Sequence, residues 1–82
     1  MELKKQSYVA NGLANLYRAA LYLGRGFPLI GLDFVKQAKI VIGDRSPILK
    51  ELEKSITLKT SKSEAKIWAE KVLDEYQRLF YQ

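Results

Sequence analysis

The stretch from Ser61 to Tyr81, SKSEAKIWAEKVLDEYQRLFY, carries the clearest secondary-structure signal in the chain. Its apolar residues recur at steps of three and four positions, which places them on one face of a helix. Ser61 and Glu64 have the spacing of a capping box, so the helix is expected to start directly after Ser61. We therefore predict a helix over about 62–81. Its expected inward face comprises Ala65, Trp68, Ala69, Val72, Tyr76, Leu79 and Phe80.

The opposite face of this helix is charged, and we expect it to face water. Its charges form i, i+4 pairs of opposite sign, each worth only ~0.2–0.5 kcal/mol on an exposed helix. A carboxylate that performs acid–base chemistry needs a cleft that shifts its pKa, so these acids are interpreted as solvated rather than catalytic. The pairs are Lys66/Glu70, Lys71/Glu75 and Asp74/Arg78.

Apolar spacing predicts a first helix over about Ser7–Leu23. Asn11 followed by Gly12 is also a turn signal, so the start lies either near Ser7 or near Asn11, which would then cap a shorter helix. Gly24 is the candidate for the left-handed position that ends the helix. The expected inward face comprises Val9, Leu13, Leu16, Tyr17, Ala20 and Leu23.

Two more helices are predicted in the middle of the chain. The first covers Pro28–Ile42, with a short strand at the β-branched residues 40–42 as the alternative. Ser46 followed by Pro47 is a strong helix start, and it predicts a short helix over about Pro47–Ile56. The expected inward residues of the 28–42 helix are Ile30, Phe34, Ala38, Val41 and Ile42.

These four helices, joined by short turns, predict an all-α fold. We expect a small antiparallel four-helix bundle of two helical hairpins in which the third helix is short. The 82 residues are enough for a single domain, residues 1–82. A chain of this size buries only about 63% of its unfolded surface on folding, so its core is thin. A homo-oligomer or a protein partner is therefore expected.

The composition excludes several kinds of chemistry. The chain has no Cys and no His, so it offers no thiol nucleophile, no imidazole base, no disulfide and no common zinc ligand set. We expect no enzymatic activity, no cofactor and no metal. The longest uncharged run, residues 6–17, is far shorter than the ~20 residues that cross a bilayer. With no export signal, a cytoplasmic location and no membrane contact are expected.

Basic residues outnumber acidic ones by 14 to 9, for a formal net charge of +5. Residues 1–45 hold seven basic and three acidic side chains, which is +4 of that total. This asymmetry suggests, as an alternative function, a nucleic-acid-associated module that binds the phosphate backbone through the first hairpin. The candidate residues for this face, or for an acidic partner, are Arg18, Arg25, Lys36 and Lys39.

Several apolar and aromatic residues fall off the predicted inward faces, and such residues mark an interface when they are contiguous. The candidate protein interface comprises Tyr22, Leu29, Ile40 and Ile67. Asn11 and Asn15 form a possible polar recognition stripe, because Asn is a poor helix former. The plainer alternative is that Asn11 caps the helix and Asn15 faces water. The leading hypothesis is a small non-catalytic helical module that acts through protein–protein contacts or self-association.

Overall fold

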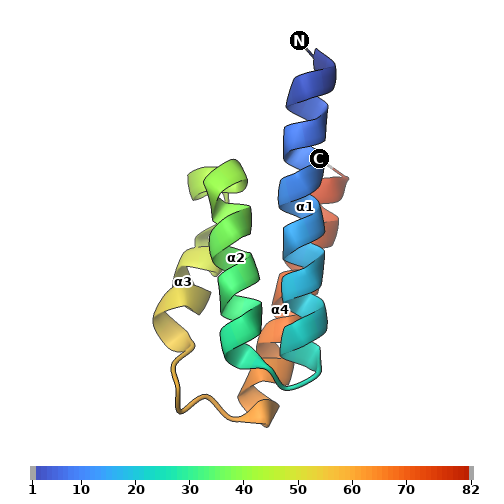
Figure 1. The fold of residues 1–82 in the computed structure, drawn as a ribbon. Coiled ribbons are helices and arrows are strands. Elements are labelled where there is room, and N and C mark those ends of the chain that lie inside the picture. The colour runs from blue at the N-terminus through green and yellow to red at the C-terminus, as the bar shows by residue number, and fades with distance from the viewer. Residues whose placement is uncertain (1, 82) are drawn as a thin grey trace.

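The computed structural model describes the backbone of residues 2–81 and the side chains of residues 10–43 and 45–81 (Figure 1). It confirms the predicted all-α fold, an antiparallel bundle of four helices of which the third is short. The elements are α1 (Glu2–Gly24), α2 (Pro28–Ile42), the 3₁₀ helix η1 (Gly43–Arg45), α3 (Pro47–Ser55) and α4 (Lys62–Phe80). Helix α1 begins at Glu2, earlier than either predicted start, and the Asn11–Gly12 pair lies inside it.

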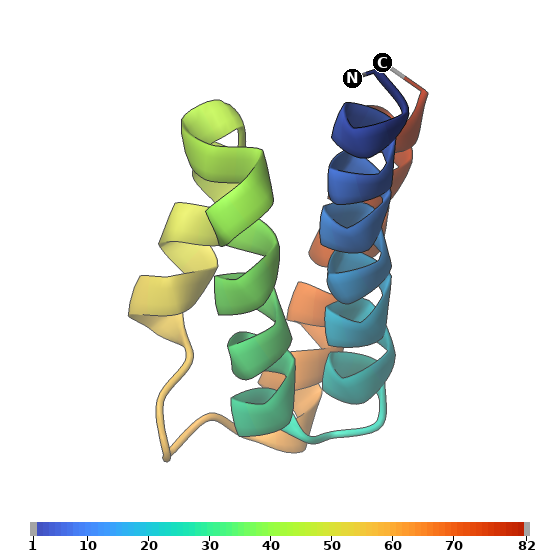
Figure 2. The ribbon, with the colours of Figure 1, turned by 45° about the horizontal axis from the view of Figure 1, so that its top comes forward.

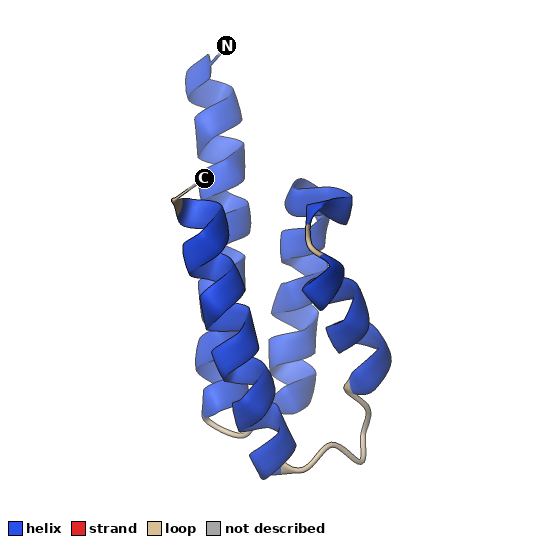
Figure 3. Cartoon of the chain, turned by 180° about the vertical axis from the view of Figure 1, so that it is seen from behind, coloured by secondary structure: helices blue, strands red, loops and turns tan. Residues whose placement is uncertain are grey.

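The helices follow one another around an elongated bundle that measures 43 × 18 × 18 Å. Helix α1 packs against both α2 and α4, and the short α3 lies beside α2 (Figures 1 and 3). Both chain ends lie at one end of the bundle, whereas the α1–α2 turn and the α3–α4 loop lie at the other (Figure 2). None of the helices within residues 2–81 combines the length and the apolar character that crossing a membrane requires.

Helices α1 and α2 approach each other closely because glycines line their contact. A Cβ atom at Gly31 would lie 2.5 Å from Cγ of Leu23, and one at Gly12 would lie 2.9 Å from Cβ of Val41. Both distances are too short for a side chain, so only glycine fits while the backbones keep this separation. Gly12 is therefore a packing residue in the middle of α1, and its turn signal is overridden by this contact.

The buried face of α2 is rotated relative to the predicted one. Val35 is fully buried, whereas Ile30, predicted to face inward, is 46% exposed. The reason is the packing of Gly31 against Leu23, which turns the Gly31 and Val35 side of the helix toward α1 and moves Ile30 outward.

Two other residues expected in the core, Tyr17 of α1 and Phe80 of α4, are half-exposed. The rings of Tyr17 and Phe80 lie at the outer edge of the α1–α4 contact. Ala19 of α1, which was not expected in the core, is buried. The core comprises Leu16, Ala19, Ala20, Leu23, Val35, Ala38, Ile42, Leu49, Leu52, Ile56, Ala65 and Val72.

A Schellman motif ends α1. The Phe27 N–H donates to the Tyr22 carbonyl (2.9 Å), and the Gly26 N–H donates to the Leu23 carbonyl (3.1 Å). Gly26 has φ +84°, the left-handed conformation that this motif requires. The rings of Tyr22 and Phe27, 6.5 Å apart, make the apolar contact that accompanies the motif. The prediction of Gly24 at the left-handed position is therefore wrong, because α1 continues through Gly24.

The close α1–α2 contact predicts opposite effects for two glycine substitutions. Gly31→Ala should lower the free energy of unfolding by about 1–3 kcal/mol, because the new methyl group overlaps Leu23. Gly24→Ala, whose Cβ would lie 3.7 Å from Ala69, should raise it by up to ~1 kcal/mol through helix propensity. Urea unfolding of the two variants measures both values. Equal stabilisation by both substitutions would contradict the packing at Gly31.

Candidate functional site

A buried polar cluster joins α4 to the start of α3. Among the described side chains, Glu75 and Ser46 are the buried polar ones, and Glu75 is only 3% exposed. The Ser46 hydroxyl donates to Oε2 of Glu75, and Nη2 of Arg78 donates to the same oxygen at 3.1 Å. Nε of Arg78 donates to Oε1, and its Nη2 also reaches the Arg45 carbonyl at 3.4 Å. Ser46 is the N-cap residue of α3, but its side chain makes this tertiary bond instead of a capping bond.

The expectation that Glu75 faces water beside Lys71 is therefore wrong. Glu75 follows Val72 by three residues and Trp68 by seven, so it borders the apolar face of α4, and this spacing is the signal that reveals its burial. The hydrogen bonds from Arg78 lower the pKa of the Glu75 carboxyl below its ordinary value, against the opposing effect of burial. The carboxylate thus stays ionised and bonded, which suits a structural contact between α3 and α4.

The lowered pKa of Glu75 predicts how stability changes in acid. Because the pKa is lower in the folded state, its contribution to stability is present above the ordinary value of 4.5 and is lost as the pH falls through the folded pKa. Glu75→Gln should cost about 1–2 kcal/mol at neutral pH and should flatten the loss of stability in acid. Urea unfolding across this pH range measures the effect. Glu70→Gln, an exposed position on α4, is the control, and a Glu75→Gln profile parallel to the wild type would contradict the assignment.

A shallow apolar cavity of about 210 Å³ lies between α1 and α4. Tyr17 and Leu21 of α1 and Leu73 of α4 line it and remain exposed to solvent. Ala20 and Ala69 form its floor, because their short side chains leave the space between the longer ones open. The complete lining is Tyr17, Ala20, Leu21, Ala69, Glu70 and Leu73.

A row of aromatic rings continues this cavity toward the C-terminus. The Tyr17 and Tyr76 ring centroids are 5.6 Å apart, those of Tyr76 and Phe80 are 5.8 Å apart, and those of Phe80 and Tyr81 are 5.1 Å apart. Phe80 and Tyr81 are both exposed to solvent. Tyr17 belongs to both the cavity and the row, so the two form one surface. We call this surface the α1–α4 face: Tyr17, Leu21, Leu73, Tyr76, Phe80 and Tyr81.

The four residues of the predicted protein interface lie elsewhere. Tyr22 is half-buried, with its ring stacked on Phe34 at 5.4 Å. Leu29 lies next to Phe27 at the start of α2, whereas Ile40, which is 75% exposed, lies three helical turns further along α2. Ile67 is 56% exposed on α4. The described contacts do not gather these four into one surface.

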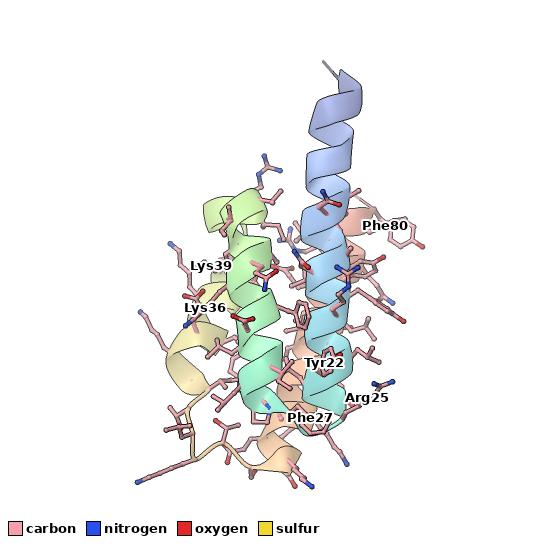
Figure 4. All side chains as sticks on the ribbon, in the orientation of Figure 1. Tyr22, Arg25, Phe27, Lys36, Lys39 and Phe80 are labelled. Atoms are coloured by element: carbon pink, nitrogen blue, oxygen red, sulfur yellow. The ribbon has the colours of Figure 1, made fainter. Side chains whose placement is uncertain are left out.

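The predicted basic face is divided. Lys39 is bonded to Glu53 of α3 across 3.2 Å. Figure 4 shows Lys36 and Lys39 on the side of α2 away from α1, whereas Arg25 projects on the opposite side of the molecule. Arg18, the fourth residue of the predicted basic face, donates from Nη1 to the side-chain oxygen of Asn15 at 3.1 Å.

The two residues of the predicted polar stripe, Asn11 and Asn15, lie at the surface of α1, and Asn15 is partly buried. Asn11 is exposed inside the helix and is not a cap, while Asn15 accepts the bond from Arg18.

Within the described residues, no group of three or more Asp or Glu side chains is arranged to hold a metal ion. No protein-family model, curated protein or solved structure matches this chain. The candidate site therefore rests on the geometry of the chain itself, in which the α1–α4 face joins an apolar cavity to a row of aromatic rings.

Proposed function

We propose that the protein is a small, non-catalytic helical interaction module of the cytoplasm that acts through protein–protein contacts. In the form that we propose, the α1–α4 face joins two copies of the chain. The observation that carries the proposal is the continuity of this face, in which Tyr17 connects the apolar cavity to the aromatic row. Contiguous exposed apolar surface is typical of interaction sites, whereas scattered apolar residues are not.

The exposed surface of the chain is larger than its mass predicts. A monomer of 9.4 kDa typically exposes ~5,000 Å², whereas this chain exposes 5718 Å². The elongated shape of the bundle, 43 × 18 × 18 Å, accounts for part of this excess. The exposed apolar side chains of the α1–α4 face contribute to it as well, and a second copy that covers them would reduce it.

The chemistry of the face favours apolar association over charge attraction. Two copies each carry a net charge of +5 and repel one another at long range. Burial of the side chains of Leu21, Leu73 and Phe80 lowers the free energy by about 25 cal/mol per Å² of apolar area removed from water. Added salt screens the repulsion and leaves the apolar contact in place, so it should strengthen the dimer. Binding of nucleic acid through Arg18, Arg25 and Lys36 would instead weaken as salt rises.

Charged substitutions on the α1–α4 face should dissociate the dimer. Leu73→Glu and Phe80→Glu each place a carboxylate where apolar surface is buried, so each should raise the dimer Kd about tenfold or more. Sedimentation velocity or light scattering at micromolar concentrations, at low and high salt, measures the change.

The matched controls are Ile67→Glu on α4 and Ile40→Glu on α2, both exposed and both off the face. They should leave the dimer intact. A monomeric wild-type protein at every salt concentration would overturn the self-association proposal. Dissociation by the two control variants, but not by Leu73→Glu or Phe80→Glu, would place the interface at Ile40 and Ile67, as predicted from the sequence.

A further inference from the structure

A second exposed apolar surface lies at the end of the bundle opposite the chain termini. There the α1–α2 turn and the α3–α4 loop lie at the same end of the bundle (Figure 1). The α1–α2 turn, the first residues of α2 and Leu58 of the loop line a shallow cavity of about 210 Å³. Leu58 of the loop is 86% exposed, which is the largest exposure among the large apolar side chains described. We call this surface the tip: Phe27, Leu29, Ile30 and Leu58.

Basic side chains border the tip. The segments that build it, residues 24–33 and 56–64, contain three basic residues, Arg25, Lys59 and Lys62, and two acidic ones, Asp33 and Glu64. The stem of Lys62 covers Gly26, since a Cβ atom at Gly26 would lie 2.9 Å from Cγ of Lys62. Arg25 and Lys59 flank the turn and the loop in sequence. The tip therefore combines protruding apolar side chains with a positively charged border.

Several backbone donors of the two loops are satisfied within the chain. In the α3–α4 loop, the Thr57 N–H donates to the Thr60 hydroxyl at 2.8 Å, and the Thr60 N–H donates to the Thr57 carbonyl at 3.1 Å. The Lys59 N–H donates to the Thr57 hydroxyl at 3.1 Å. In the α1–α2 turn, the N–H groups of Gly26 and Phe27 are used by the Schellman motif. These particular groups lose no hydrogen bonds to water when the tip leaves it.

We propose that the tip binds the surface of a lipid bilayer that contains anionic lipids. Leu58, Leu29 and Ile30 enter the boundary between headgroups and acyl chains, where apolar side chains are stabilised. Lys59, Lys62 and Arg25 remain at the level of the phosphate groups, with their stems along the apolar surface. Such a contact needs no membrane-spanning helix. It differs from the expectation, drawn from composition, of no membrane contact, and the vesicle experiment below decides between the two.

The aliphatic residues of the tip distinguish a membrane from a nucleic acid. A phosphate backbone attracts Lys and Arg, but it offers no apolar surface to cover Leu58 or Leu29. Tip and α1–α4 face use different residues, so either proposal can fail without the other.

Co-sedimentation with vesicles tests the proposal. The protein should bind vesicles that contain phosphatidylserine and should bind pure phosphatidylcholine vesicles much more weakly, with affinity falling as salt rises. Lys59→Gln and Lys62→Gln should each lower the affinity about fivefold, since each removes one positive charge near the anionic surface. Leu58→Glu should abolish binding, and because Leu58 is so exposed, circular dichroism should show an unchanged fold. Leu58→Glu should also leave self-association unchanged.

A fluorescent label tests the orientation directly. Because the chain has no cysteine, Leu58→Cys provides a single attachment point for an environment-sensitive dye. Its emission should shift to the blue when phosphatidylserine vesicles are added. The same dye at Ile40→Cys, exposed near the other end of α2, is the matched control and should not shift.

Three results would overturn the proposal. The first is no binding to phosphatidylserine vesicles, and the second is binding that Leu58→Glu does not change. The third is a blue shift at position 40 without one at position 58. Retardation of RNA or DNA that Lys59→Gln and Lys62→Gln abolish, with no vesicle binding, would assign the basic border to nucleic-acid phosphates instead.

Discussion

Helices α1 and α2 lie so close together that glycine is required at two points of their contact. Gly31 accommodates Leu23, and Gly12 accommodates Val41. This separation sets the rotation of α2, which places Val35 in the core and leaves Ile30 outside. It also gives α1 two packed sides, one against α2 and one against α4. Tyr17 lies at the outer edge of the contact between α1 and α4. Because packing against α2 sets the rotation of α1, it also sets where Tyr17 lies in the α1–α4 face.

Local signals in the sequence predicted the helices well. Pro28 and Gly43 delimit α2 at its observed bounds, and the Ser61 side chain accepts the Glu64 N–H at 3.1 Å as the capping box requires. The periodic spacing of apolar residues was less successful in predicting which side of each helix faces the core. The apolar face of a single helix spans a wide arc, and only contacts between helices select the part that is buried. Gly31 shows this, because its role depends on Leu23, which belongs to another helix.

The candidate surfaces were harder to predict for the same reason. The prediction of Ile40 and Ile67 as interface residues considered the outer side of each helix separately. The α1–α4 face instead consists of edge residues from two helices, which become neighbours only when α1 and α4 pack. Likewise, Glu75 belongs to a charged pattern along α4, but its partner Ser46 lies 29 positions earlier in the chain. The spacing of Glu75 from Val72 and Trp68 indicates that it borders the apolar face, but it does not identify a partner so distant in sequence.

The α1–α4 face is made by the first and the last helix of the chain. Helix α1 has its neighbour α2 as soon as 42 residues are present, because a short turn joins the two and their contacts are local in sequence. The other side of α1 stays uncovered until α4 follows. A partly folded chain therefore presents half of the face and cannot form the full contact. In the dimer that we propose, assembly is coupled to completion of the fold, and an increase in protein concentration raises the thermal unfolding temperature.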